Sequence, residues 1–267
     1  MRWSERQRAM LGAMGITLWG PDRVEARDAP ATTVPRPRDP GAAVACADTP
    51  ARAEASARAA GGVRAAFVAA PAPDAADIAT LDWNALRARV ASCRACRLCE
   101  SRTQTVFGVG NPRAHCMIVG EAPGENEDLQ GEPFVGSAGQ LLDRMLLAIG
   151  LTRGEAEPAQ QVFIANTLKC RPPRNRNPEP AELARCSAYL VRQIELVQPK
   201  LLLAMGRFAV QALLDSSEPI GRLRGRVHRW RDLPVVVTYH PAYLLRNPAD
   251  KVRAWADLCL AATLLAR

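Results

Sequence analysis

Short apolar runs alternate with longer amphipathic segments over the last two thirds of the chain. Four five-residue runs rich in Val, Ile, Leu or Met predict strands at 116–120, 162–166, 201–205 and 235–239. Segments with apolar residues every three or four positions predict helices at 81–90, 139–149, 179–197, 208–214 and 249–265. Strands that alternate with helices indicate a mostly parallel sheet with helices on both faces.

The first 80 residues follow neither pattern. Residues 41–80 contain eighteen alanines in forty positions, and Pro30, Pro35, Pro37 and Pro40 precede them. Such a segment buries too little apolar surface to offset the entropy lost on ordering, so we predict a disordered linker over 21–80. A short apolar peptide (1–20) precedes this linker, and one folded domain (81–267) follows it.

The charge of the chain is uneven. The formal net charge is +8, and residues 81–267 hold twenty-five Lys and Arg against eighteen Asp and Glu. This field attracts polyanions such as nucleic acid, although many basic surfaces bind nothing. No apolar stretch reaches the roughly 18–20 residues of a membrane span, and no apolar run follows the charged N-terminus. We therefore expect a cytoplasmic protein without a membrane partner.

Eight cysteines in such a protein require an explanation. Cytoplasmic thiols stay reduced, which favours metal or cluster ligation over disulfides. Cys93 and Cys96 form a CxxC pair, Cys99 repeats the spacing, and Cys170 and Cys186 follow downstream. Four thiolates can hold either a structural zinc ion or an iron–sulfur cluster, and the spacing alone leaves both open.

Polar residues follow three of the predicted strands directly. An acidic loop that begins at Glu121 follows the first strand, Asn166 ends the second, and His240 follows the fourth. In sheets of this kind, functional loops lie beyond the carboxyl ends of the strands. We therefore predict that an acid, an amide and an imidazole meet in one site.

The sequences GEAPG (120–124), PFVG (133–136), KCRPP (169–173) and HPAYLLR (240–246) together resemble the family-four uracil-DNA glycosylases. These are bacterial and archaeal enzymes that hold a [4Fe–4S] cluster, and the resemblance covers residues 85–260. It implies a three-layer α/β/α sandwich with a central, mostly parallel four-stranded sheet. It also implies a monomeric DNA-repair enzyme of the bacterial nucleoid, which flips uracil out of DNA and hydrolyses its N-glycosidic bond.

The resemblance also implies roles for individual residues. Asn166 would read the edge of uracil, Phe134 would stack on the base, and His240 would donate a hydrogen bond to uracil O2. Ala122 holds a position where related families carry Asp or Asn, so Glu121, or less favourably Glu127, would orient the attacking water. The implied contacts with DNA are Arg171, Arg174, Arg176, Arg246 and, as the wedge that fills the vacated stack, Leu244. The implied cluster ligands are Cys93, Cys96, Cys170 and Cys186, while Cys99 departs from the family pattern.

Parts of the sequence are also compatible with other functions. A protein of the same fold could bind uracil-containing or single-stranded DNA without turnover. Relatives that form a covalent adduct use a histidine after the second strand, and residues 170–178 contain none. A radical iron–sulfur enzyme would space its first two cysteines by three residues rather than two, so that alternative is disfavoured.

Residues 8–19 suggest a partner of the replication machinery. Leu11, Met14, Ile16 and Trp19 are apolar anchors on a tether, a pattern typical of peptides that dock into a partner's groove. The segment faintly resembles the N-terminal peptide of the psi subunit of bacterial DNA polymerase III. The alternative is that it packs back on the folded domain.

Overall fold

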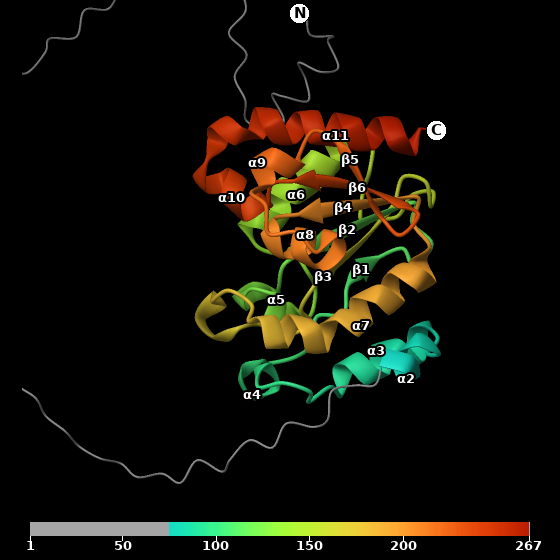
Figure 1. Ribbon diagram of the computed structural model, residues 1–267, viewed down its shortest axis with the longest axis vertical. Coiled ribbons are helices and arrows are strands. Elements are labelled where there is room, and N and C mark those ends of the chain that lie inside the picture. Colours follow the sequence, from blue (N-terminus) through green and yellow to red (C-terminus); the bar gives the residue numbers. More distant parts are fainter. Residues whose placement is uncertain (1–74, 267) are drawn as a thin grey trace, which may run out of the picture. The chain divides into compact units, whose positions relative to one another are not determined.

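The computed structural model describes residues 75–266 (Figure 1). Its centre is a six-stranded sheet in the order β1-β3-β2-β4-β6-β5. The four predicted strands form the parallel middle: β2 (Cys116–Gly120), β3 (Val162–Asn166), β4 (Leu201–Met205) and β6 (Leu233–Thr238). Two short edge strands, β1 (Val109–Gly110) and β5 (Val227–Trp230), run antiparallel to their neighbours. The expected four-stranded sheet is thus correct for the centre and misses both edges.

Helices cover both faces of this sheet. One face packs against α6 (Ser137–Ala148), α10 (Pro241–Arg246) and α11 (Lys251–Leu265). The other packs against α3 (Trp83–Ala91), α7 (Pro180–Val197) and α8 (Arg207–Leu214), and Figure 1 shows α7 and α11 on opposite sides. Successive strand residues explain the two cores, because Ile118 joins the first whereas Met117 and Val119 join the second. The predicted three-layer α/β/α sandwich is confirmed.

Shorter elements complete the domain. They are α2 (Ala75–Ala79), α4 (Leu98–Ser101), α5 (Glu125–Gln130), α9 (Ile220–Leu223) and two 3-10 turns at Pro173–Asn175 and Pro248–Asp250. Among the helices of residues 75–266, none is long and apolar enough to cross a membrane.

The folded domain begins before the predicted boundary at residue 81. Helix α2 lies inside the segment predicted as linker, and its Ile78 is only 1% exposed. Ile78 shares a core cluster with Tyr189 and Ile194 of α7. One large apolar side chain is therefore enough to attach the end of an alanine-rich segment to the domain. The rest of the predicted linker and the peptide at 1–20, including the proposed docking residues 8–19, lie outside the described residues.

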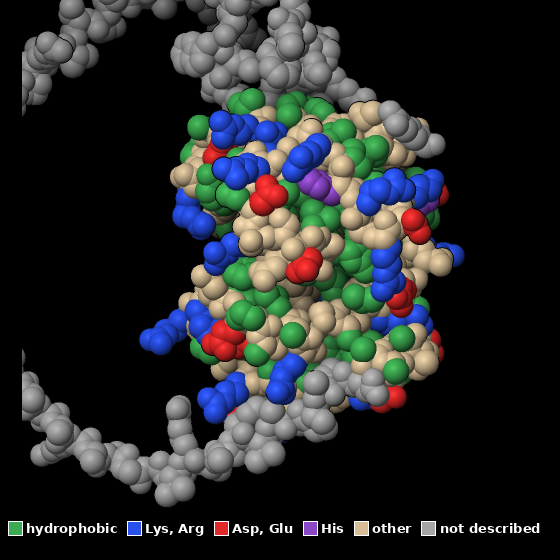
Figure 2. Space-filling model, in the orientation of Figure 1, with side chains coloured by type: hydrophobic (Ala, Val, Ile, Leu, Met, Phe, Trp, Pro, Cys, Tyr) green, Lys and Arg blue, Asp and Glu red, His purple; other side chains and the backbone are tan. Residues whose placement is uncertain are grey.

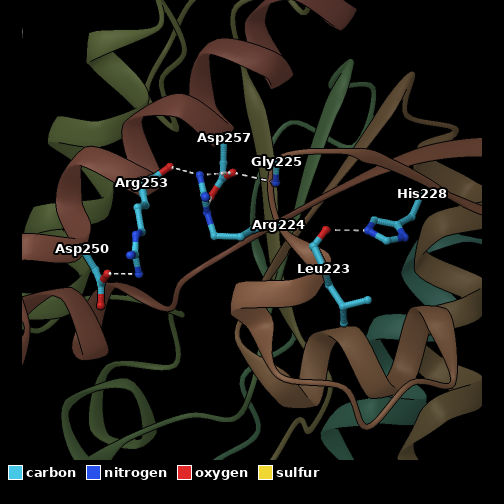
Figure 3. Close-up of polar contacts among 7 residues, drawn as sticks. All are labelled: Leu223, Arg224, Gly225, His228, Asp250, Arg253 and Asp257. Carbon is cyan, nitrogen blue, oxygen red and sulfur yellow. Dashed lines mark hydrogen bonds and ion pairs between the residues drawn. The ribbon is translucent and has the colours of Figure 1, made fainter.

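A buried ion pair fixes the C-terminal helix (Figure 3). Asp257 of α11 is fully buried and accepts hydrogen bonds from Arg224 at 2.8 and 3.0 Å and from the Gly225 backbone N–H at 3.1 Å. Burial raises the pKa of Asp257, and the Arg224 guanidinium opposes that shift. A buried carboxylate is stable only with such partners. The ion pair therefore links α11 to the turn between α9 and β5.

Candidate functional site

The loops that follow β2, β3 and β6 meet in one pocket. The parallel strands end on the side of the sheet where α5 and α10 lie, so their loops are neighbours (Figure 1). Six residues that the sequence assigns to substrate and catalysis line this pocket: Glu121, Ala122, Glu127, Phe134, Asn166 and His240.

Asn166 is the most deeply buried polar group of the pocket. It ends β3 opposite Gly120 of β2, and it is 2% exposed. Within the described part of the chain, its side-chain Oδ1 has no hydrogen-bond partner. A Cβ atom on Gly120 would lie 2.4 Å from that oxygen and 2.8 Å from the Phe134 ring. Glycine at position 120 therefore lets the amide and the ring approach each other.

Two flat rings form a wall of the pocket. The Phe134 and His240 rings are stacked, with centroids 5.3 Å apart and planes inclined by 26°. Phe134 is 6% exposed, although its loop runs along the pocket. Stacked planar groups of this kind offer a face to another planar, aromatic molecule.

The protonation of His240 follows from its position at the start of α10. Its Nδ1 accepts a hydrogen bond from the Ala242 backbone N–H at 3.2 Å, so the proton of the neutral ring is on Nε2. Burial lowers the pKa of His240 to about 4; Arg246 lowers it further and Glu127 opposes the shift. The ring is therefore neutral at pH 7 and has one N–H to donate.

Glu121 is the available acid of the pocket. Burial raises the pKa of its carboxyl group, and the Arg207 guanidinium opposes that shift. A carboxylate with a raised pKa is a better proton acceptor than an ordinary one. The neighbouring Ala122 offers only a methyl group, which packs against the cluster of Leu98, Leu168 and Cys170.

Glu127 is engaged with the backbone. One carboxylate oxygen accepts from the Gly124 N–H at 3.1 Å, and the other accepts from the N–H groups of Val135 and Gly136 at 3.0 and 3.3 Å. Its two oxygens thus join the loop after β2 to the loop that carries Phe134. This geometry favours a positioning role for Glu127 and leaves Glu121 as the acid that can orient water.

The three arginines after β3 that are predicted to contact DNA differ in their surroundings. Arg176 lines the pocket and forms a two-pronged ion pair with Glu182 at 2.6 and 3.0 Å. Arg171 donates to Asn175 at 2.8 Å. Arg174 is exposed at a φ of 55°. The first two therefore hold the loop after β3, and Arg174 is the one that projects from it.

The predicted wedge residue, Leu244, is fully buried in the core between α10 and α6. A side chain without exposed surface cannot enter a base stack, so this geometry does not favour Leu244 as the wedge. The next residue, Leu245, is 43% exposed, and Arg246 beside it is exposed as predicted. On a six-residue helix, one position of difference turns a side chain from the core to the surface.

Figure 2 shows basic side chains dispersed among acidic ones on the face that it draws. Because this face has no continuous basic patch, contacts with DNA there would depend on individual side chains.

A second cavity is lined by five cysteines: Cys93, Cys96, Cys99, Cys170 and Cys186. All are free thiols. In the described residues, no three Cys, His, Asp or Glu side chains are close enough to hold a single metal ion. Cys116 is buried in the hydrophobic core, and the partly buried Cys259 packs against it.

Two cations beside the cysteines had no role in the sequence analysis. The Arg102 guanidinium donates to Cys170 Sγ at 2.8 Å and to the Cys93 carbonyl at 2.7 Å. Burial raises the pKa of Cys170 to about 12, and Arg102 opposes that shift. Lys169, 2% exposed, donates to the Asn166 carbonyl at 2.7 Å and to Gln193 Oε1 at 2.6 Å. The sequence could have indicated a role for Lys169, because it lies between the candidate site residues Asn166 and Cys170. Nothing in the sequence indicates a role for Arg102.

Comparison with known proteins identifies the fold. The profile of the Uracil DNA glycosylase superfamily matches residues 107–259. The chain belongs to this superfamily. The Type-4 uracil-DNA glycosylase of Archaeoglobus fulgidus is 46% identical over 167 residues, which are 60% of this chain and 81% of the relative. The Type-4 enzyme of Thermotoga maritima is 42% identical over 62% of this chain and 84% of the relative.

A Type-5 uracil-DNA glycosylase, from Pyrobaculum aerophilum, is 31% identical over 52% of this chain and 66% of its own length. The higher identities to Type-4 proteins confirm membership of family four, as the sequence motifs predict. The superfamily match contains every residue named in the pocket, together with Cys170 and Cys186. Cys93, Cys96 and Cys99 precede it. The five-cysteine cavity thus joins the superfamily domain to the segment N-terminal to it.

Proposed function

We propose that the protein excises uracil from DNA by hydrolysing the bond between the base and the sugar. The observation that carries this proposal is the buried, unpaired Oδ1 of Asn166 in the pocket. An unpaired buried acceptor is costly, which favours a ligand that donates a hydrogen bond there. Uracil has the N3–H donor next to the O4 acceptor, and one carboxamide complements both. Cytosine lacks the N3–H and carries an amino group in place of O4, so it mismatches the same amide.

The remaining pocket residues suit a base that has left the duplex. A uracil inside a base stack is out of reach of a pocket, so the nucleotide has to be flipped out. The ring of Phe134 then offers a stacking surface, which favours a planar base. Gly120 supports this geometry, because any larger residue would separate Phe134 from Asn166.

His240 supports cleavage of the bond. As the bond between C1′ and N1 breaks, its electron pair goes to the base, and negative charge collects on uracil O2. The neutral imidazole would donate from Nε2 to that oxygen. A donor that interacts most strongly with the developing charge lowers the barrier rather than only binding substrate.

Glu121 supports the second half of the reaction. Water adds its oxygen to C1′ of the positively charged sugar, and one of its protons passes to a general base of the protein. The Glu121 carboxylate fits this role because it lies in the pocket with a raised pKa. Glu127 would act by holding the two loops together.

Release of free uracil tests the proposal. The full-length protein is incubated with an oligonucleotide containing one uracil and, as the control, with the same oligonucleotide containing thymine. We expect free uracil and an alkali-labile abasic site from the first substrate only. Binding of the uracil oligonucleotide without release would instead support the alternative, a non-catalytic binding module.

The five-cysteine cavity fits the [4Fe–4S] cluster that the sequence resemblance implies. Its lining holds five free thiols, the donor type that such a cluster needs, and Cys93, Cys96, Cys170 and Cys186 are the four that the resemblance implies. We assign these four as the ligands. When bound, the cluster would cross-link the segment before α4, the loop after β3 and helix α7.

Removal of single cysteines should distinguish ligands from the fifth thiol. Cys170→Ala and Cys186→Ala should lose iron and the visible absorbance of an iron–sulfur cluster, with a large loss of soluble protein. Cys99→Ala should keep roughly four iron atoms per chain, as in the unsubstituted protein. Iron and zinc are measured on anaerobically purified protein. Stoichiometric zinc without iron would contradict the cluster assignment.

Contacts with DNA are assigned to the exposed side chains near the pocket: Arg174, Arg246 and, in place of Leu244, Leu245. Leu245→Ala should slow uracil excision from duplex DNA by roughly tenfold and hardly affect thermal stability, because only an exposed apolar contact is lost. Leu244→Ala is the matched control. It should cost about 2–5 kcal/mol of folding free energy, because it empties a filled core position. Equal excision rates for Leu245→Ala and the unsubstituted protein would contradict the new assignment.

A further inference from the structure

The loop that carries Phe134 has a backbone conformation that bulky residues rarely adopt. The φ of Phe134 is 56°, in the left-handed region. Its carbonyl oxygen lies against Gly139 of α6, where an added Cβ would be only 1.7 Å away. Such a conformation costs energy and persists only where surrounding contacts hold it. The position of the ring therefore depends on the contacts of loop 133–136.

Contacts hold this loop on both sides of Phe134. On the C-terminal side, Glu127 accepts hydrogen bonds from the Val135 and Gly136 backbone N–H groups. On the N-terminal side, Arg153 Nη1 donates to the Pro133 carbonyl at 3.0 Å. Arg153 comes from the segment after α6 and is not among the residues that line the pocket. It is thus a remote group that touches the peptide immediately before Phe134.

A second contact sets the orientation of Arg153. Its Nε donates to Asp143 Oδ1 of α6 at 2.7 Å, and the Arg153 side chain is only 18% exposed. Its Nη2 is buried and has no hydrogen-bond partner in residues 75–266. A surface guanidinium held only by its ion pair could turn all its N–H groups to water. Arg153 instead leaves one donor unpaired while another reaches the Pro133 carbonyl.

We propose that Arg153 is a positioning residue for the base-stacking ring, held in place by Asp143 and acting through the Pro133 carbonyl on Phe134. The consequence for the reaction rests on the proposed uracil excision. The consequence for the conformation of Phe134 does not, so the two can be tested separately.

A double-substitution cycle tests the consequence for the reaction. Arg153→Met keeps most of the aliphatic stem and removes both hydrogen bonds. We expect it to lower the single-turnover rate of uracil excision by about tenfold, because small displacements of a positioning group are costly. In a Phe134→Ala background the same substitution should change the rate by less than about twofold, because the ring it positions is gone. An equal loss in both backgrounds would overturn the proposal.

The matched control is Arg192→Met. Arg192 also donates to a backbone carbonyl (Leu81, 2.8 Å) and to a carboxylate (Glu195, 3.4 Å), and it is 19% exposed. It lies on α7, and it does not line the pocket. We expect similar losses of thermal stability in the two variants but a slower excision rate in Arg153→Met alone. A comparable loss of rate in Arg192→Met would show a general effect of stability and overturn the proposal.

A measurement that needs no activity tests the conformation. The protein is labelled with 4-fluorophenylalanine, and the Phe134 resonance is assigned by its absence in Phe134→Leu. We expect Arg153→Met to shift or broaden that fluorine resonance, Arg153→Lys to do so less, and Arg192→Met to leave it unchanged. A shifted resonance in a protein that releases no uracil would support the positioning role while refuting the proposed function. An unmoved resonance in Arg153→Met would overturn the positioning role.

Discussion

Asn166→Asp should lower the single-turnover rate of uracil excision by roughly 10²–10⁴-fold at neutral pH. A buried group that recognises its partner by hydrogen bonds loses that recognition when its donor becomes an acceptor. The substitution preserves the shape of the side chain at the end of β3. It places an acceptor oxygen, in place of the amide nitrogen, opposite uracil O4, itself an acceptor, and adds a charge in a buried site. We therefore expect the loss in the chemical step as well as in substrate binding.

The pH dependence of this variant gives a second test. Burial raises the pKa of a carboxyl group. As the pH falls through that raised pKa, the new carboxyl group gains an O–H donor and again offers one donor and one acceptor. The excision rate of Asn166→Asp, relative to the unsubstituted protein, should therefore rise toward acid pH. Faint excision of cytosine is a further expected result at neutral pH.

Asn111→Asp is the control for this experiment. Asn111 is a partly buried asparagine that contacts Gln161 and the Arg113 backbone, and it is not among the residues that line the pocket. We expect an unchanged rate of excision. A rate for Asn166→Asp close to that of the unsubstituted protein would show that Asn166 does not read the base.

The sequence could predict that Glu121, Asn166 and His240 lie in one site, because this depends only on where the strands end and on their parallel direction. Each follows or ends an apolar run, and parallel strands carry their carboxyl ends to one edge of the sheet. The edge strands could not be predicted in this way. β1 has two residues, and β5 alternates exposed with half-buried positions and includes Arg229, so neither produces a buried apolar run.

The differences between the sequence analysis and the structure come from side-chain direction and tertiary contacts. Leu244 and Leu245 are identical as residues, and only the packing of α10 decides which one is buried. Arg176 resembles a phosphate ligand in sequence, but Glu182, 6% exposed on the first turn of α7, holds it. Arg153 carried no signal at all, because its partners Pro133 and Asp143 adjoin it only in the folded chain.

The other large effect is expected from His240→Ala. This substitution removes the N–H that would meet the charge on uracil O2, and the loss of one such donor typically costs about 10²–10³ in rate. The affinity for uracil-containing DNA should change much less, because the donor interacts most strongly with charge that exists only while the bond breaks. Single-turnover measurements at saturating enzyme separate this step from product release.

His240→Gln and the pH profile distinguish the neutral ring from a charged one. An amide N–H can replace part of the donation, so His240→Gln should retain more activity than His240→Ala. Burial lowers the pKa of His240 to about 4, so the neutral donor is present from about pH 5 upward and the rate should not fall between pH 6 and 8. As the pH falls, the excision rate should instead decrease with the protonation of Glu121. The raised pKa of Glu121 means that its carboxylate is lost before His240 becomes charged. A rate that declines above pH 6.5 and loses this decline in His240→Gln would show that the imidazolium is the active form, and it would contradict the assignment of a neutral His240.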